Sequence, residues 1–216
     1  MKKNLIVCGL IVLGMAGAAQ AAIILDTDWT VDEAIPAGYP TGITVSQSFP
    51  NLYNGEITSV SVDLNISGGF NGGLYGYLVY QDANGNTATE TLLNYIGTSP
   101  SNPFGSSGAG LNVTLSDSGT INGSIHGATG IPTGTWLPDS SITLNSTFGG
   151  MAADGTWTLF LADMYAGDTS GTLESWGLEV TAIPEPAEAG LILGIGGLVA
   201  LGLGLWNRSR RQGLQV

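Results

Sequence analysis

Ser59-Val60-Ser61-Val62-Asp63-Leu64-Asn65-Ile66 is the stretch that decides the fold, because polar and aliphatic side chains alternate along it without a break. A period of two places the aliphatic side chains on one face of a strand and the polar ones on the other. A helix would scatter the same residues around its axis. The stretch therefore predicts a β-strand with one face in a core and one in water.

The chain around this strand repeats the same kind of signal. Segments 74–80 and 87–93 flank the turn sequence Asp82-Ala83-Asn84-Gly85-Asn86, so they predict a hairpin. Further strands are predicted around Leu111, Val113 and Leu115, around Ile142 and Leu144, around Trp157, Leu159 and Leu161, and around Trp176, Leu178 and Val180. Many short strands joined by Gly, Asn and Ser turns indicate an all-β fold, an antiparallel jelly-roll β-sandwich over residues 22–182.

The two tryptophans of the last predicted strands share a face with aliphatic neighbours. Trp157 alternates with Leu159 and Leu161, and Trp176 with Leu178 and Val180. We expect both indoles in the core rather than on a ligand-stacking surface.

The distribution of charge restricts the function of this region. The five cations lie near the two ends of the chain, at Lys2, Lys3, Arg208, Arg210 and Arg211. Residues 22–181 hold fifteen of the seventeen acids. Carboxylates without cations repel phosphate backbones, so we expect no nucleic acid partner; the acidity serves solubility or binds divalent cations. The sole cysteine, Cys8, lies in the first 21 residues, which excludes disulfides and thiolate sites from the rest.

The first 21 residues have the parts of a secretory signal peptide. Two lysines precede an apolar stretch over residues 5–19, and Ala19-Gln20-Ala21 supplies the small side chains that signal peptidase recognises. We expect cleavage between Ala21 and Ala22, with signal peptidase as a partner and export of the domain that follows.

The end of the chain combines a rigid motif, an apolar run and positive charge. Ile183-Pro184-Glu185-Pro186 is followed by the apolar residues 189–206 and then by a basic end over 208–211, with Arg208, Arg210 and Arg211. Eighteen residues at about 1.5 Å each span roughly 27 Å, which predicts one C-terminal transmembrane helix. The arginines are expected to stay in the cytoplasm and to leave the preceding domain outside.

Together these three parts resemble the PEP-CTERM sorting signal of exopolysaccharide-producing Gram-negative bacteria, here over residues 183–211. The resemblance implies recognition by exosortase, a membrane-embedded protease similar to cysteine transpeptidases. It also implies export across the inner membrane, a transient C-terminal anchor, and delivery to the cell surface or extracellular matrix.

A second resemblance lies within the predicted sandwich. Segments 154–159, 162–163, 167–169 and 171–178 are similar, in that order, to the closing strands of the P domain (P/Homo B domain) of subtilisin-like proprotein convertases. Gly72-Gly73-Leu74 is similar to that family's GDL strand, but Gly73 stands where an Asp is usual, which weakens any cation site inherited there. The resemblance implies a galactose-binding-like jelly roll.

Catalytic chemistry finds little support in the sequence. His126 is the only histidine, so any Ser-His-Asp triad must use it, and we expect a loop residue instead. Gly97-Thr98-Ser99-Pro100 echoes a subtilisin nucleophile loop only faintly. Fifteen acids make chance carboxylate pairs expected, and none is singled out for glycoside hydrolysis. We therefore predict that the protein is not an enzyme and has no catalytic residue and no cofactor.

Calcium is the metal that the remaining side chains would suit. The segment from Asp82 imitates the start of an EF-hand loop, but Thr87 and Leu93 occupy the places of its glycine and its bidentate glutamate. Asp163 and Asp168 bracket a turn at the end of a predicted strand and are weak calcium candidates. Capping of that turn by their side chains is the alternative that we favour.

Three functions are compatible with these features. We favour a noncatalytic exported cell-surface or extracellular-matrix protein, embedded in or tethered near extracellular polysaccharide. The second function is a carbohydrate-binding module for exopolysaccharide, which would expose aromatic residues such as Tyr39, Tyr53, Tyr75, Tyr77 and Trp136. The third is an accessory domain linked to serine-type proteolysis or a hydrolase, which would need a suitable acidic pair or His126 in a cleft.

Overall fold

Residues 20–166 and 169–184 are described by the computed structural model, and most of their regular structure is β-strand. The strands are β1 (Ala22–Ile35), β2 (Ile43–Phe49), β3 (Gly55–Gly68), β4 (Leu74–Asp82), β5 (Thr87–Asn94), β6 (Gly110–Ser116), β7 (Thr133–Trp136), β8 (Gly155–Asp163) and β9 (Gly171–Pro184). Between them lie the α-helix α1 (Leu144–Phe148) and the 3-10 helices η1 (Asn71–Gly73), η2 (Gly119–Ile121) and η3 (Ile125–Gly127).

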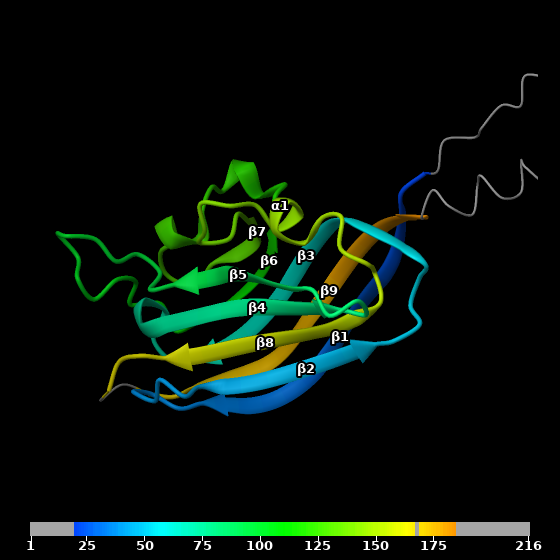
Figure 1. The fold of residues 1–216 in the computed structure, drawn as a ribbon. Helices are drawn as coiled ribbons and strands as arrows, with labels where there is room; N and C mark the ends of the chain where they lie inside the picture. The colour runs from blue at the N-terminus through cyan, green and yellow to red at the C-terminus, as the bar shows by residue number, and fades with distance from the viewer. Residues whose placement is uncertain (1–19, 167–168, 185–216) are drawn as a thin grey trace, which may run out of the picture. The chain divides into compact units, whose positions relative to one another are not determined.

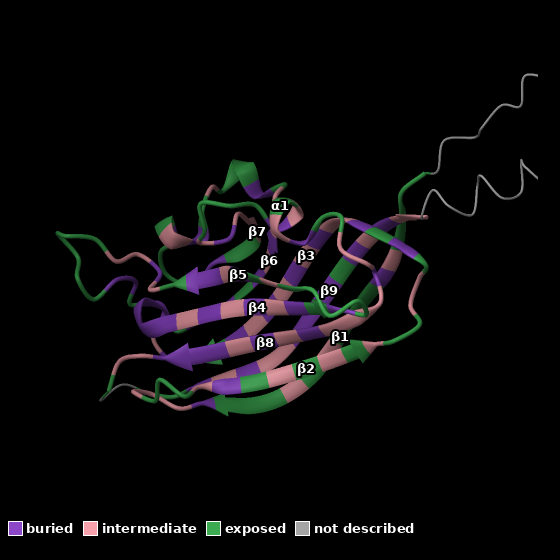
Figure 2. Cartoon of the chain, viewed as in Figure 1, coloured by how far each residue is buried: buried purple, intermediate pink, exposed green. Residues whose placement is uncertain are grey.

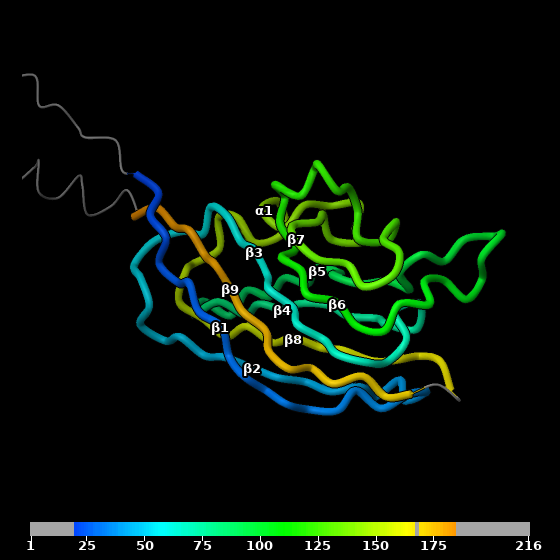
Figure 3. Tube along the Cα trace, turned by 180° about the vertical axis from the view of Figure 1, so that it is seen from behind, coloured from blue at the N-terminus to red at the C-terminus, as the bar shows by residue number. Residues whose placement is uncertain are grey.

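The strands form two sheets that pack face to face. Sheet A has the order β1-β9-β3-β6-β7, and sheet B has the order β2-β8-β4-β5. Sheet B lies in front in Figure 1, and the strands of sheet A are nearest in the reverse view of Figure 3. The predicted all-β sandwich is therefore confirmed. The pairing is antiparallel except between β6 and β7, which run parallel over four residues at the edge of sheet A.

The alternating stretch forms most of β3, in the centre of sheet A between β9 and β6. Its aliphatic residues Val60, Val62, Leu64 and Ile66 are at most 3% exposed, and its polar residues are partly exposed, as predicted. The predicted hairpin is confirmed in β4 and β5. Its turn is closed by Asp82, whose carboxylate accepts hydrogen bonds from the backbone of Asn84 and Asn86.

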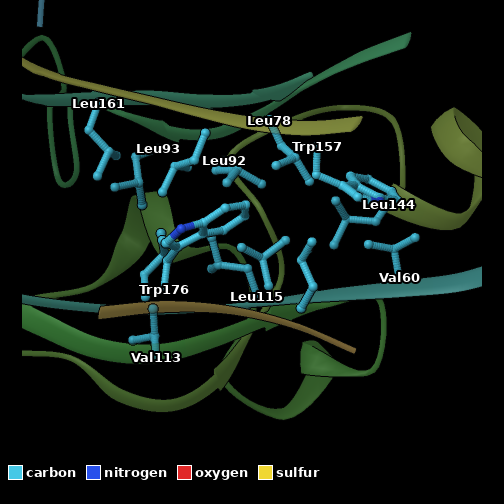
Figure 4. Close-up of a cluster of buried hydrophobic side chains, with 14 of the residues drawn as sticks. Val60, Leu78, Leu92, Leu93, Val113, Leu115, Leu144, Trp157, Leu161 and Trp176 are labelled. Atoms are coloured by element: carbon cyan, nitrogen blue, oxygen red, sulfur yellow. The ribbon is translucent and has the colours of Figure 1, made fainter. Parts of the chain in front are cut away.

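The core between the sheets contains both predicted tryptophans (Figure 4). Trp157 and Trp176 are each 1% exposed, so the core prediction is confirmed. Trp157 stacks on Tyr80 with ring centroids 4.0 Å apart. Trp176 packs against Trp29 of the edge strand β1 at 5.1 Å. Each indole therefore packs on another aromatic ring in the core, and neither ring is exposed for stacking on a ligand.

The strand predicted around Ile142 and Leu144 is wrong. Leu144 begins α1, and Ile142 is 57% exposed. A helix forms here instead of a strand because the first N–H groups of the helix are hydrogen-bonded. The carboxylate of Asp117 accepts hydrogen bonds from the N–H groups of Leu144 and Asn145, at 3.0 and 2.9 Å. Thr143 adds an N-cap.

Three strands were not predicted, and their patterns explain why. β1 contains a register shift between Thr30 and Glu33 with Asp32 at φ 53°, which interrupts its alternation. In β2 the polar Gln47 stands among the inward-facing residues and interrupts the hydrophobic alternation, and β7 has only four residues. β8 and β9 follow each other in sequence but belong to different sheets.

The predicted membrane segments lie largely outside this structure. Residues 1–19, with most of the signal peptide, and residues 185–216, with the apolar run 189–206, are not described. Within the described ranges, no helix has the length and hydrophobicity needed to cross a bilayer.

Candidate functional site

The outer face of sheet B carries no charged side chain. It is built from the residues that alternate with the buried residues of each strand (Figure 2). Three rows cross the strands in the order β2, β8, β4, β5: Thr44–Phe160–Tyr77–Thr91, Ser46–Thr158–Val79–Thr89 and Ser48–Thr156–Gln81–Thr87. The hydroxyls of Ser46 and Thr158 hydrogen-bond across strands at 2.9 Å, and those of Ser48 and Thr156 do so at 3.0 Å. The face is thus a lattice of neutral hydrogen-bonding groups.

Aromatic side chains run from this lattice to the end of the sheet. We call them the aromatic strip, and its members are Phe160, Tyr77, Tyr75, Tyr95, Tyr165, Phe70 and Phe104. Tyr77 stacks on Phe160 with ring centroids 4.6 Å apart and an interplanar angle of 16°. Tyr75 follows at 6.1 Å from Tyr77. These three rings stand on adjacent strands of a rigid sheet, so their spacing is fixed by the strand register.

Loops supply the far half of the aromatic strip. Tyr95 follows β5 and lies 6.1 Å from Tyr75, and Tyr165 follows β8 and lies 6.4 Å from Tyr95. Tyr165 contacts Phe104 and Phe70 at 6.1 and 5.9 Å. Its hydroxyl also donates to the carbonyl of Pro103 at 3.0 Å, which ties the two loops together. Phe104 is 67% exposed, and the other six rings are partly exposed.

The outer face of sheet A, unlike that of sheet B, carries acidic side chains. Asp28 of β1 and Asp63 of β3 face each other across Gly177 of β9, where a side chain would strike the Asp28 carboxylate. Burial, followed by the nearby charges of Asp63 and Asp26, raises the pKa of Asp28. The domain therefore concentrates negative charge on one face and leaves the other neutral.

Several acids away from this face accept hydrogen bonds from the backbone. Asp117 caps α1, Asp82 closes the hairpin turn, and Asp154 accepts a hydrogen bond from the backbone N–H of Tyr53 at 2.8 Å. Burial opposes the charge of Asp82, but hydrogen bonds from Asn86 and other donors outweigh it and lower the pKa of this carboxyl. These carboxylates therefore stabilise a helix end, a hairpin turn and a loop.

His126 pairs with an acid but faces no nucleophile. Its Nδ1 lies 2.8 Å from Asp139 Oδ2, which is the Asp–His half of a catalytic triad. Its Nε2, where a serine hydroxyl would lie, is 2.9 Å from the carbonyl oxygen of Thr98. The Ser99 hydroxyl instead contacts Ser101 and the backbone of Asn102. Proton transfer from a serine is therefore not built into this pair. The residue lies in η3 rather than in an irregular loop.

The calcium candidates are only partly within the structure. Asp163 ends β8, is fully buried, and accepts a hydrogen bond from the backbone of Tyr165 at 3.1 Å, whereas Asp168 lies outside the described residues. Across the described ranges, no group of three or more acidic, histidine or cysteine side chains is arranged to hold a metal ion. A Cβ at Gly73 would lie 2.3 Å from the Asp163 carboxylate, so the glycine at this position makes room for that acid.

The five tyrosine and tryptophan residues named as candidate sugar-stacking groups lie in three different environments. Tyr75 and Tyr77 belong to the aromatic strip, and Tyr39 is exposed, at 63%. Tyr53 and Trp136 pack against the core, and the Trp136 indole donates to the carbonyl of Thr133. Two of the five are thus brought together on one face.

Five residues of the aromatic strip escaped the sequence analysis, and one of them left a readable signal. Phe160 alternates with Leu159 and Leu161 and therefore had to lie opposite the core. Tyr95, Tyr165, Phe70 and Phe104 come from loops, and only the tertiary fold brings them beside the strands.

The proposed processing residues fall at the edge of the described chain. Ile183 and Pro184 end β9, where they pair with Glu56 and Gly55 of β3. Ala22, the expected new N-terminus, pairs with Ala182 on the neighbouring strand. Ala21 is exposed. Ala19, Glu185, Pro186, Arg208, Arg210 and Arg211 lie outside the described residues.

Comparisons with known proteins leave the chain without a family. No family model and no curated protein matches it. Among solved structures, it is similar to that of infectious bursal disease virus Gt strain, with 12% identity, a TM-score of 0.33, and coverage of 83% of this chain and 35% of the other. The VP2 subviral particle of infectious bursal disease virus gives 12% identity, a TM-score of 0.29, and coverage of 83% and 37%. The chain thus spans about a third of the length of these viral proteins.

Proposed function

We propose that this protein is a noncatalytic exported surface or matrix protein whose aromatic strip binds extracellular polysaccharide. The observation that carries the proposal is the strip itself: stacked and edge-packed rings on a sheet face that has neutral hydroxyl and amide side chains and no charge. The C–H bonds on the faces of a sugar ring pack on the negative faces of aromatic rings, and its hydroxyls pair with side chains such as Thr and Gln.

The chemistry of this face favours a glycan over other partners. The centre of a protein interface is enriched in aromatic residues, methionine and arginine and depleted in serine, whereas the three rows beside the aromatic strip are mainly Ser and Thr hydroxyl groups and contain no Met or Arg. A glycan chain is long and flat enough to follow rings spaced about 6 Å apart. The acidic face of sheet A would repel polyanions, so we assign a neutral polysaccharide as the ligand.

Export and sorting remain part of the proposal. The signal peptide, the PEP-CTERM-like tail and exosortase processing rest on sequence resemblance, as does the finer assignment of the sandwich as a galactose-binding-like jelly roll of the P-domain type. Binding by a domain of this kind would retain the protein in the extracellular polysaccharide after removal of its tail.

Affinity electrophoresis of residues 22–184 tests the proposal. Gels containing dextran or galactomannan supply neutral glycans, and a gel containing alginate supplies an acidic one. We expect retardation by a neutral glycan and a loss of at least about tenfold in affinity for Tyr77→Ala, which is about 1.4 kcal/mol. Absence of retardation by every neutral glycan would contradict the proposal.

Two control variants separate stacking from folding and from the rest of the surface. Tyr77→Phe keeps the ring that stacks on Phe160 and should bind nearly as well as the parent. Glu179→Gln removes an exposed acid from the outer face of sheet A and should leave binding unchanged. Equal losses in Tyr77→Ala and Glu179→Gln would show that the aromatic strip is not the binding surface.

A further inference from the structure

The turn that presents Tyr95 to the aromatic strip is fixed by several hydrogen bonds, among them one from the Tyr95 N–H to the carbonyl of Leu74 at 2.9 Å, and three further contacts come from His126. The N–H of Thr98 donates to the carbonyl of Tyr95 at 3.0 Å and closes this turn, which begins at the end of β5. Tyr95 has φ 55°, a left-handed conformation that a bulky residue rarely adopts unless its surroundings impose it.

His126 contacts both ends of that turn. Its Nδ1 lies 3.2 Å from the carbonyl oxygen of Asn94, just before Tyr95, and its Nε2 lies 2.9 Å from the carbonyl oxygen of Thr98. The backbone carbonyl of His126 also accepts the N–H of Gly97 at 2.6 Å. Three contacts from one residue therefore clamp the five-residue segment Asn94–Thr98, which carries the Tyr95 ring.

This arrangement requires a hydrogen on each ring nitrogen. The oxygen atoms that face the ring are two backbone carbonyls and the Asp139 carboxylate, and all three are acceptors. A neutral imidazole carries one N–H, so its second nitrogen would turn a lone pair towards an oxygen. The ring is 38% exposed, which lets its proton exchange with water. Between residues 20 and 184 the sequence has no lysine or arginine that could replace this donor.

We propose that His126 is a positioning residue for the glycan site, and that its doubly protonated ring holds the Asn94–Thr98 turn, and with it Tyr95, in the binding conformation. The inference rests on the proposed function. The glycan site would then be pH-sensitive: complete while both nitrogens carry hydrogen, and disordered at its loop end once the second proton leaves.

Among the described residues, Asp139 is the titratable group that hydrogen-bonds the His126 ring. The end of β5 and the turn contribute only the carbonyl oxygens of Asn94 and Thr98. Burial lowers the pKa of His126, but the hydrogen bonds to Asp139, Thr98 and Asn94 and the charge of Asp139 outweigh it, so this pKa is raised overall. Burial also raises the pKa of Asp139, against the opposing effect of His126. The clamp is therefore complete below the ordinary histidine pKa of about 6.5 and is lost as pH rises through the higher folded value.

Two measurements on residues 22–184 test the clamp without any glycan. In nitrogen-15 NMR spectra, both His126 ring nitrogens should carry hydrogen at pH 6 and titrate together at a pKa above that of free histidine. Chymotrypsin can cleave after the exposed Phe104, and His126→Gln should speed this cut at least about fivefold. The matched control Ser124→Ala removes the hydroxyl that accepts the His126 backbone N–H and leaves the ring contacts in place, so it should cleave like the parent. A singly protonated ring at pH 6, or equal cleavage of the two variants, would overturn the clamp.

A third measurement links the clamp to binding. Retardation of the parent in dextran or galactomannan gels should weaken at least about threefold as pH rises through the measured pKa of His126, and His126→Gln should bind weakly at every pH. If the clamp titrates but binding does not follow, the positioning role is refuted while the glycan function stands. If Tyr77→Ala binds like the parent, the proposed function fails, whatever the clamp does.

Discussion

Replacing Trp176 with phenylalanine should leave the stability of the domain almost unchanged, although this indole is among its largest buried side chains. Its Nε1 is buried and has no hydrogen-bond partner. An unpaired buried donor costs about 1–3 kcal/mol relative to a donor in water. Trp176→Phe removes that donor together with two ring carbons, whose burial contributes about 0.8 kcal/mol each. The two effects oppose each other, so we expect a change within about 1 kcal/mol.

Trp157→Phe is the matched comparison. Trp157 is equally buried, stacks on Tyr80 at 4.0 Å, and is not among the residues with an unpaired buried atom. The same loss of ring atoms should therefore destabilise the domain by about 1–3 kcal/mol more than it does at Trp176. Trp157→Ala should cost about 3–5 kcal/mol, and Trp176→Ala should fall at the lower end of that range.

Urea denaturation of residues 22–184, followed by far-ultraviolet circular dichroism, measures these differences. Equal m-values across the variants would show that the same transition is compared. A Trp176→Phe variant that loses 2 kcal/mol or more, or the same amount as Trp157→Phe, would refute the reasoning and show that the indole N–H is satisfied in solution.

The remaining predictions concern the turn near β8, the end of β9 and the sorting tail. Gly73→Asp should destabilise the domain by at least about 2 kcal/mol because its Cβ would lie 2.3 Å from the carboxylate of the buried aspartate that ends β8; recovery of the thermal melt on adding calcium would instead reveal a cation site. A fragment ending at residue 181 should melt several degrees below one ending at 184, since it lacks the fully buried Ala182; identical melts would show that the end of β9 adds nothing. Alanine at both Glu185 and Pro186 should permit export but block removal of the tail in an exosortase-bearing host, and normal processing on immunoblots would contradict the sorting signal.

Sequence reasoning succeeded where one face of an element meets water and the other meets the core. β3, the β4–β5 hairpin and both core tryptophans follow from a period of two and from turn residues. It failed at Leu144, because the acid that caps α1 lies at residue 117 and only the fold brings the two together. Local patterns do not record such distant partners.

In the candidate site, too, residues set by local patterns could be predicted, and contacts between distant residues could not. Tyr75 and Tyr77 were named from the sequence only among five aromatic residues that a carbohydrate-binding module would expose, and the structure places both opposite the core residues of β4. The partners of His126 could not be named, since Asn94 and Thr98 lie in one turn and Asp139 lies in a second segment, and both are separate from residue 126 in the sequence. Loops converge according to sheet order, and sheet order is set by packing over the whole domain.

The position of β9 also has a consequence for how the chain is made. β9 is the last strand of the described chain, yet it lies between β1 and β3 and is the neighbour of β1 in sheet A (Figure 3). A chain that crosses a membrane from its N-terminus would deliver β1 first and leave it without a partner in its sheet until residue 184 emerges. The closing step must then join the two ends of the domain, which makes folding slow and dependent on distant contacts. If the domain is exported as proposed, it could not be completed strand by strand during secretion, and it would stay open to proteases and chaperones until its final strand arrives.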